Sequence, residues 1–273
     1  MNNKILILGK GFIGEKLRKE LDCPVCPGFI KSFNDVDRII KKYRPKVIIN
    51  CIGITGKRNV DDCEVDKDAA LTANSFVPLI LAESAIRNNI KLVHISSGCI
   101  FKFDYKKDRP IAEGRTPDFF GLFYSRSKIY SDLALEALSA EFNILIARIR
   151  IPLSNEHHPR NILDKLIKYR KVITVKNSVT YIPDFIRALK HLIKIDARGV
   201  YNIVNKGGLS YLKLMNVYKK YVPGFTYKTT DFRKLGLVRT NLIMSTRKLE
   251  KSGFKVRTID SVLEECVKEY LKS

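Results

Sequence analysis

The sequence predicts an α/β fold, namely a Rossmann-like doubly wound parallel sheet with a smaller C-terminal lobe. Apolar runs alternate with helical patterns through the first two thirds of the 273 residues. A glycine-rich turn, Gly9-Lys10-Gly11-Phe12-Ile13-Gly14, joins the first apolar run to the first helical pattern. Near-continuous apolar strands are typical of a parallel sheet that helices cover on both faces. The expected architecture is therefore a layered nucleotide-binding type of domain.

Local patterns predict each element of this first part. Aliphatic and β-branched residues predict strands over 4–8, 46–51, 91–96 and 143–149, with a weaker strand near 24–30. Apolar residues spaced three and four apart predict helices over 13–21, 35–43, about 66–88 with an interruption at Pro78, and 123–138. The alternation of the two element types supports one continuous sheet.

The regular alternation of strand and helix patterns changes after Pro152. Strands are expected near 172–175, 178–182 and 199–204, and helices over 160–169, 183–193, 211–221 after an N-cap at Ser210, 245–252 and 259–271. We expect residues 1–152 to form an NADP-binding Rossmann domain to which 178–205 return. Residues 153–177 and 206–273 are expected to form the smaller, substrate-binding lobe.

The composition is that of a globular protein, with 45% hydrophobic and 29% charged residues. No apolar run approaches the roughly 20 residues of a membrane span, so no membrane association is expected. The net charge of +22 arises from lysines scattered along the whole chain, without a basic block. This pattern favours a basic cleft for anionic nucleotides over nucleic-acid binding, which is not expected.

The six cysteines show no disulfide framework, which predicts a reducing, cytoplasmic location. Cys23 and Cys26 form a lone CxxC without a second pair, so a zinc site is not expected. The tandem His157-His158 stands in a polar stretch and is interpreted as a pair of surface residues. We therefore predict no metal.

The glycine turn predicts a dinucleotide cofactor. Gly9, Gly11 and Gly14 follow a strand and open a helix, where glycine lets the backbone approach a pyrophosphate at the helix N-terminus. No acid stands at the end of the second strand, and Lys10 is basic, so NADPH is favoured and NADH remains possible. The candidate cofactor ligands are Gly9, Lys10, Gly11, Phe12, Ile13, Gly14, Cys51, Ile52, Gly53, Asn74, Tyr124 and Lys128.

Ser97, Tyr124 and Lys128 are the candidate groups for carbonyl reduction. Tyr124 and Lys128 are four residues apart, so they share one face of a helix, where the ammonium lowers the pKa of the phenol. Ser97 directly follows the fourth strand, at the edge where ligands bind in open sheets. Ser97 is expected to hold a carbonyl oxygen while Tyr124 delivers a proton and Lys128 binds the nicotinamide ribose.

These elements resemble the extended short-chain dehydrogenases/reductases. The chain is most similar to the dTDP-4-dehydrorhamnose reductases and the bifunctional nucleotide-rhamnose synthases, which are 3,5-epimerase/4-reductases. The segments that carry the resemblance are 53–61, Cys63-Glu64, 97–101, 123–128, Arg150-Ile151-Pro152, Pro159-Arg160-Asn161 with Lys165, 177–180 and 239–241. The likeness covers nearly the whole chain.

The resemblance implies the substrate and two further catalytic residues. It implies a 4-keto-6-deoxyhexose bound to UDP or dTDP, with Cys99 and Lys165 as the acid/base pair of epimerisation. Arg160, Asn161 and Arg239 are then candidates for binding the diphosphate and hydroxyl groups, together with Ser97, Cys99 and Lys165. The product would be an L-rhamnose-type sugar nucleotide, made by epimerisation at C3, or at C3 and C5, and reduction at C4. A homodimer is possible.

Two departures from the family pattern keep alternatives open. The turn reads GxGxxG where the family usually has GxxGxxG, and the loop before Lys165 carries an additional Glu156-His157-His158. The second departure leaves the C2 substituent open between hydroxyl and acetamido. Apart from the resemblance, Cys99 reads as a small buried residue and Lys165 as a solvated one. A 4-reductase without epimerase activity and a non-catalytic dinucleotide-binding regulatory subunit are the remaining alternatives.

Overall fold

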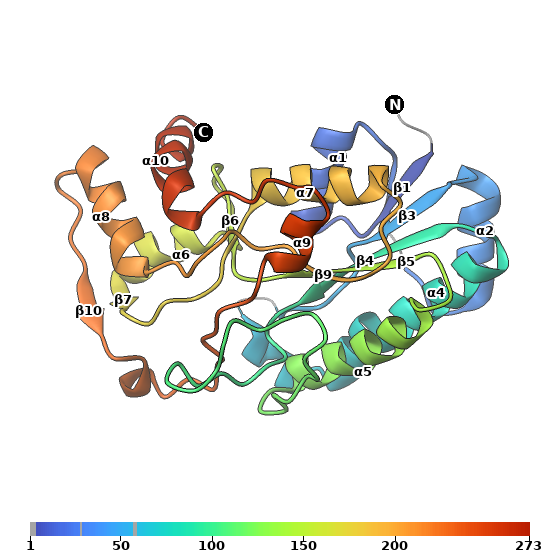
Figure 1. Ribbon diagram of the computed structural model, residues 1–273, viewed down its shortest axis with the longest axis horizontal. Coiled ribbons are helices and arrows are strands. Elements are labelled where there is room, and N and C mark those ends of the chain that lie inside the picture. The colour runs from blue at the N-terminus through green and yellow to red at the C-terminus, as the bar shows by residue number, and fades with distance from the viewer. Residues whose placement is uncertain (1–3, 28, 57–58) are drawn as a thin grey trace. The chain divides into compact units, whose positions relative to one another are not determined.

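The computed structural model describes residues 4–27, 29–56 and 59–273 (Figure 1). Residues 1–3, Gly28, Lys57 and Arg58 lie outside the described residues. Gly28 belongs to the weak strand predicted near 24–30, and Lys57 and Arg58 belong to the family-like segment 53–61. The chain divides into two compact units. Unit 1 comprises Met1–Ile100, Pro117–Arg148 and Ile193–Tyr201, and unit 2 comprises Phe101–Thr116, Ile149–Leu192 and Asn202–Ser273. The sequence had suggested a longer returning segment, 178–205.

A six-stranded sheet in the order β2-β1-β3-β4-β5-β9 forms the centre of unit 1. Its strands are β1 (Ile5–Leu8), β2 (Val25–Cys26), β3 (Val47–Asn50), β4 (Lys91–Ser97), β5 (Ile144–Ile149) and β9 (Gly199–Asn202). The pairings of β1 with β2 and β3, and of β3 with β4, are parallel. Every residue of β1, β4 and β5 is buried, as expected of parallel strands that helices cover on both faces. The predicted Rossmann-like α/β class is confirmed.

Helices lie on both faces of this sheet, with α4 and α5 side by side on one face and α1 on the other (Figure 1). Their bounds are α1 (Phe12–Leu21), α2 (Phe33–Tyr43), α3 (Lys67–Leu71), α4 (Val77–Arg87) and α5 (Phe123–Leu138). Alternate residues of β1 and β3, including Leu6, Leu8 and Ile48, pack against Val36 of α2 and Leu81 of α4 in one core. The predicted helices are confirmed to within about two residues at each end.

Pro78 does not break the long helix; it is preceded by a π-helical turn, Thr72–Phe76, that joins α3 to α4. Proline has no N–H, and its ring crowds the carbonyl four residues earlier, which here belongs to Asn74. The wider turn accommodates the ring, and the Asn74 carbonyl instead accepts a hydrogen bond from Ser131 Oγ at 2.7 Å. The predicted interruption is therefore a local widening, of a kind often found at functional sites.

The stretch Lys67–Arg87 has the length and apolar composition that could cross a membrane. The expectation that no run approaches this length was wrong here, because the helix continues past Pro78. However, 56% of its apolar window is buried inside the structure, as in the core helix of a globular domain.

Lys91, at the start of β4, is a buried lysine that holds three segments of unit 1 together. Its ammonium donates to Asn143 Oδ1 at 2.6 Å, to Asp196 Oδ1 at 2.9 Å and to the Ala197 carbonyl at 2.7 Å. Three acceptors satisfy all three donors of the ammonium. Burial lowers the pKa of Lys91, while the hydrogen bond with Asp196 opposes that shift.

We expect Lys91→Met to lower the free energy of unfolding by about 1–3 kcal/mol, because it leaves the buried Ala197 carbonyl without its partner. Urea denaturation of the variant measures this loss. Lys46→Met, at an exposed lysine next to β3, is the control and should leave the free energy of unfolding within about 0.5 kcal/mol of the unmodified chain. Equal stabilities of the two variants would contradict the role given to Lys91.

Unit 2 is built on small two-stranded pairings and helices. Strand β6 (Pro152–Leu153) pairs with β8 (Thr180–Tyr181), and β7 (Lys171–Ile173) pairs with β10 (Lys228–Thr230), both in parallel. Its helices are α6 (Ile162–Tyr169), α7 (Ile182–Lys194, whose last two residues belong to unit 1), α8 (Tyr211–Tyr221), α9 (Arg247–Lys251) and α10 (Ile259–Tyr270). One apolar core connects α6, α8 and α10. Ser210 is the N-cap of α8 as predicted, although its side chain makes no capping hydrogen bond.

Candidate active site

The glycine turn between β1 and α1 combines two crowded glycines with one open glycine. Gly9 has a φ of +98°, and a Cβ there would lie 2.8 Å from the Ile52 nitrogen. A Cβ on Gly14 would lie 2.1 Å from the Gly9 carbonyl oxygen. In contrast, a Cβ on Gly11, the N-cap of α1, would meet no atom within 4 Å. The space over Gly11, at a helix N-terminus, therefore fits a pyrophosphate that approaches the backbone closely.

The rest of the predicted cofactor set follows the carboxyl ends of β1 and β3. Lys10 is exposed, and Phe12 and Ile13 are partly exposed in the first turn of α1. Cys51 and Ile52 are also partly exposed, while Gly53 is exposed. Although Cys51 as a residue is partly exposed, its thiol group is buried, and this burial raises the pKa of the thiol to about 12, so the side chain is a neutral thiol at physiological pH.

The side chain of Asn74 holds the loop after β3 in place. Its Oδ1 accepts from the Ile54 N–H at 2.9 Å, and its Nδ2 donates to the Ile54 carbonyl at 3.0 Å and to Ser127 Oγ at 3.1 Å. The side chain is fully buried. Asn74 thus fixes the path of the loop that includes Gly53, and its predicted direct contact with the cofactor stays a prediction.

Hydrogen bonds connect Cys99 to Ser97 and to the helix that carries Tyr124. The Cys99 N–H donates to Ser97 Oγ at 3.1 Å, and Ser125 Oγ donates to the Cys99 carbonyl at 2.7 Å. Since Ser97 Oγ accepts from the backbone, its own proton is directed elsewhere and is available to a carbonyl oxygen. Tyr124 packs in a cluster with Cys63 and Ala70, and the half-buried Cys99 packs against this cluster.

The start of α5 is fixed by a distant carboxylate. The N-cap of this helix is Leu122, which has no capping side chain, and Glu64 Oε1 accepts instead from the Phe123 N–H at 2.6 Å. Glu64 belongs to a 3₁₀ turn, Val60–Glu64, that the sequence patterns did not predict. A carboxylate at this end is favoured by the helix dipole. This contact sets where Tyr124, one residue later, enters the site.

Lys128 is almost completely buried, one turn along α5 from Tyr124. A Cβ on Gly53 would lie 3.2 Å from its ammonium nitrogen and 3.1 Å from Asn74 Oδ1, so Lys128 reaches the loop after β3. Burial lowers the pKa of Lys128 to about 8, and the charge of Asp132 partly opposes this effect. An ammonium here is therefore at the edge of deprotonation near physiological pH.

Three of the four predicted substrate residues of unit 2 form a cationic group. Lys165, half-buried on α6, has its pKa lowered by burial and then by the nearby charges of Arg160 and Arg239. Three cations within electrostatic reach of one another suit a polyanion such as a diphosphate. A lysine with a lowered pKa is also able to act as an acid or base near neutrality.

Asn161 has a structural task in the same unit. It is fully buried as the N-cap of α6, with Oδ1 accepting from the Ser154 and Leu163 N–H groups at 3.0 and 3.2 Å. Its Nδ2 donates to the carbonyls of Ser154 and Glu156 at 2.9 and 3.1 Å. Asn161 thereby orders the loop before Lys165, and a substrate contact by its side chain stays a prediction.

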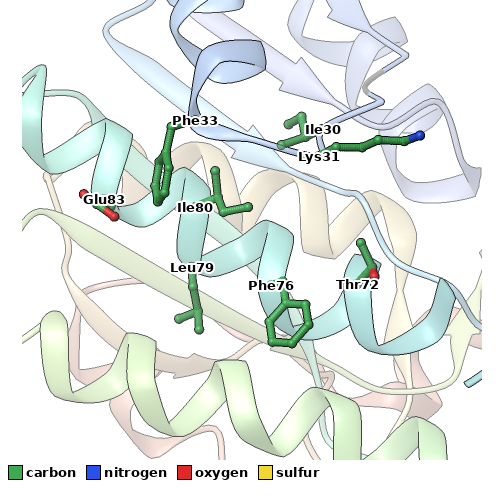
Figure 2. Close-up of a pocket in the computed structure, with 8 residues that line it drawn as sticks. All are labelled: Ile30, Lys31, Phe33, Thr72, Phe76, Leu79, Ile80 and Glu83. Atoms are coloured by element: carbon green, nitrogen blue, oxygen red, sulfur yellow. The ribbon is translucent and has the colours of Figure 1, made fainter. Parts of the chain in front are cut away.

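A mainly apolar groove of about 590 Å³ in unit 1 was not foreseen (Figure 2). It lies between the segment that follows β2 and the helical stretch that includes the π turn. Its lining residues are Ile30, Lys31, Phe33, Thr72, Phe76, Leu79, Ile80 and Glu83. Nothing in the sequence pattern marked these side chains, which come from the start of α2 and the segment before it and from the helical stretch around the π turn.

Two buried charges beneath the site, Asp132 and Arg148, were also missed. Asp132 stands four residues after Lys128 on α5, and Arg148 lies in β5; both have no exposed side-chain surface. A charged residue inside an otherwise apolar strand was the available signal, because an arginine is seldom fully buried unless it is paired.

Comparison with known proteins matches the chain to one family model, the RmlD substrate binding domain, over residues 3–272. An Arabidopsis thaliana bifunctional dTDP-4-dehydrorhamnose 3,5-epimerase/reductase is 30% identical over 237 residues, which covers 82% of this chain and 77% of that protein. A trifunctional UDP-glucose 4,6-dehydratase/3,5-epimerase/UDP-4-keto-L-rhamnose-reductase of the same plant is 30% identical over 265 residues. That match covers 91% of this chain but only 39% of the trifunctional protein.

Two solved structures share the fold. The UDP-rhamnose synthase of Acanthamoeba polyphaga mimivirus superposes with a TM-score of 0.89 at 24% identity, over 97% of this chain and 99% of that one. A dTDP-4-dehydrorhamnose reductase of Bacillus anthracis, solved in complex with NADP, superposes with a TM-score of 0.83 at 21% identity, over 97% and 98%. Both likenesses cover 97% of this chain and support the same architecture.

Proposed function

This chain belongs to the RmlD substrate binding domain family, and we propose that it reduces a 4-keto-6-deoxyhexose nucleotide with NADPH after epimerising it. The observation that supports the proposal is the hydrogen-bonded link from the end of β4 to α5. Ser97 Oγ accepts from the Cys99 N–H, and the Cys99 carbonyl accepts from Ser125 on the helix that carries Tyr124 and Lys128. The Arabidopsis bifunctional protein, which covers most of the chain, carries both activities in its name.

The cofactor would lie along the carboxyl edge of the unit 1 sheet. The glycine turn would hold the pyrophosphate over Gly11, and Lys128 would bind the nicotinamide ribose. The absence of an acid at the end of β2 leaves room for the additional phosphate of NADPH, which Lys10 and Lys31 favour by charge. When bound, the nicotinamide supplies the hydride for C4.

The reduction step needs an anchor and a proton donor. Ser97 Oγ accepts from the Cys99 N–H, which orients the hydroxyl, and its own O–H donates to the C4 carbonyl oxygen. Tyr124 donates a hydrogen bond to the same oxygen and transfers its proton as negative charge develops there. The charged Lys128 stabilises the phenolate that remains.

Epimerisation requires an acid/base pair, and Cys99 and Lys165 are the candidates. A C4 ketone acidifies the hydrogens on C3 and C5, so a base removes such a proton and an acid returns one to the opposite face. The lowered pKa of Lys165 and the fixed backbone of Cys99 support these roles. Arg160 and Arg239 would hold the diphosphate, and the nucleobase would be uracil or thymine.

We expect Cys99→Ala and Lys165→Met to reduce deuterium incorporation at C3 and C5 from heavy water by about 100-fold or more. Both variants should still reduce UDP-4-keto-L-rhamnose, whose ring carbons are already epimerised. Nuclear magnetic resonance of the product measures the label, and NADPH consumption measures reduction. A variant that incorporates label normally but fails to reduce would contradict the pairing.

The reductase proposal is tested by NADPH oxidation with UDP-4-keto-6-deoxyglucose, followed by the fall in cofactor fluorescence. We expect turnover that depends on the keto sugar. If only the pre-epimerised substrate is reduced, the chain is a 4-reductase that relies on a separate epimerase.

The same assay with the 2-acetamido analogue tests the C2 substituent, and sedimentation tests the homodimer. We place this activity in the cytoplasm, whose reducing environment suits six cysteines that form no disulfide within the described residues.

A further inference from the structure

We propose that Asp132, held in place by Arg148 and Ser96, is a positioning residue that keeps Lys128 charged for catalysis and fixes α5 against the sheet. The inference rests on the proposed reductase function and adds a residue outside the Ser97–Tyr124–Lys128 set. Asp132 touches neither substrate nor cofactor in this account; it acts through Lys128.

The first support is the arrangement along α5. Tyr124, Lys128 and Asp132 follow one another at intervals of four residues, so they form one row on the same helix face. This row faces the interior, with 6%, 4% and 0% of the residue surfaces exposed, respectively. The row thus leads from the proton donor through the ammonium to a fully buried carboxylate.

The second support is that both carboxylate oxygens of Asp132 are fixed from the sheet. Ser96 Oγ donates to Oδ1 at 2.5 Å, and Arg148 donates to Oδ2 from Nε at 2.8 Å and also from Nη2. Ser96 immediately precedes Ser97 on β4, and Arg148 lies on β5. The carboxylate therefore ties α5 to the two strands that end at the site, with the geometry of a charge-assisted pair.

The third support is the charge of the groups that face Lys128. From β4 comes His94, whose pKa is held well below its usual value by burial and then by Lys128, so the imidazole is neutral. From the loop after β3 comes the Cys51 thiol, also neutral, and from the 3₁₀ turn comes the buried Cys63. Asp132 is the carboxylate among these groups. Its negative charge raises the pKa of Lys128 and so opposes the lowering that burial causes.

Asp132→Asn is the direct test, read in the pH dependence of kcat/KM for reduction. Removing the negative charge lowers the pKa of Lys128 further, so the alkaline limb of the profile should move about one pH unit lower. Arg148→Lys keeps the charge of the pair and should leave the limb within about 0.3 units. Both substitutions disturb the buried pair and should lower the unfolding temperature. A shift of the alkaline limb in Asp132→Asn alone therefore reports the lost charge and not the lost stability.

Two further variants keep the test decisive. Leu135→Ala removes buried packing one turn further along α5 and should destabilise the chain without moving the limb. Asp132→Asn combined with Arg148→Met replaces the buried pair by neutral groups, which proteins often tolerate. The limb should again move lower, by less than in Asp132→Asn alone, because the lost charge of Arg148 offsets part of the shift.

A measurement without turnover separates this inference from the proposed function. The rate at which acetic anhydride acetylates Lys128, followed by peptide mass spectrometry against pH, reports the pKa of that amine directly. We expect the midpoint to fall by about one unit in Asp132→Asn and to stay in place in Arg148→Lys. An unmoved midpoint and limb in Asp132→Asn overturn the inference. A wild-type chain that reduces no keto sugar overturns the proposed function and leaves the acetylation result to decide the role of Asp132.

Discussion

Tyr124→Phe should lower kcat for reduction by about 100- to 10,000-fold, the range that a positioned general acid contributes. The substitution removes only the phenol oxygen, so the cluster of Tyr124 with Cys63 and Ala70 is retained. NADPH affinity and unfolding temperature should therefore remain near those of the unmodified chain. Stopped-flow measurement of NADPH oxidation gives the rate, and fluorescence titration gives the affinity.

The control for this substitution lies on the same helix. Tyr130 is 51% exposed, so Tyr130→Phe makes the same chemical change outside the site and should leave kcat within about twofold. A Tyr124→Phe variant with kcat close to that of Tyr130→Phe would mean that another group donates the proton, and the reductase mechanism would fail at its centre.

The second large effect concerns Gly11 and Gly14, for which the same substitution has opposite expected outcomes. Gly11→Ala places a methyl group in open space at an ordinary φ of −88°, so the fold should keep its unfolding temperature. That methyl group would occupy the space proposed for the pyrophosphate. The dissociation constant of NADPH should rise at least about tenfold, equivalent to about 1.4 kcal/mol.

Gly14→Ala should damage folding itself. Alanine in a helix is intrinsically favoured over glycine by about 1 kcal/mol. Here, however, the new Cβ would lie 2.1 Å from the Gly9 carbonyl oxygen, and backbone cannot move aside as a flexible side chain does. The clash should prevail, with a net loss of about 3 kcal/mol or more in urea denaturation. Normal NADPH affinity in Gly11→Ala, or normal stability in Gly14→Ala, would contradict the account of this turn.

The regular elements of unit 1 were predictable because local patterns determine them. The helix Phe123–Leu138 was predicted with its observed bounds, and β4 to within one residue, since apolar periodicity and buried strands are visible in the sequence. Short strands such as β6 and β10 have two or three residues, too few to show a period. They form through pairing with distant partners, which local patterns do not contain.

The sequence predicted the reactive residues of the site better than the contacts that position them. Ser97, Cys99 and Tyr124 were named, and the structure brings them together in unit 1. The contacts that hold them come from far along the chain, such as Glu64 at the start of α5. The π turn at Asn74 was hidden because its apolar pattern is that of an ordinary helix, although Pro78 marked the place. Whether Cys99 and Lys165 act as a pair stays a prediction.

The most direct test of the central claim is to incubate the protein with UDP-4-keto-6-deoxyglucose and NADPH in heavy water and to determine the product by nuclear magnetic resonance. The account predicts UDP-L-rhamnose with deuterium at C3 and C5, since both carbons exchange their protons before hydride reaches C4. An unlabelled D-configured sugar would leave a reductase and remove the epimerase role of Cys99 and Lys165. A lack of any NADPH consumption, with this substrate and with its 2-acetamido analogue, would contradict the proposed function altogether.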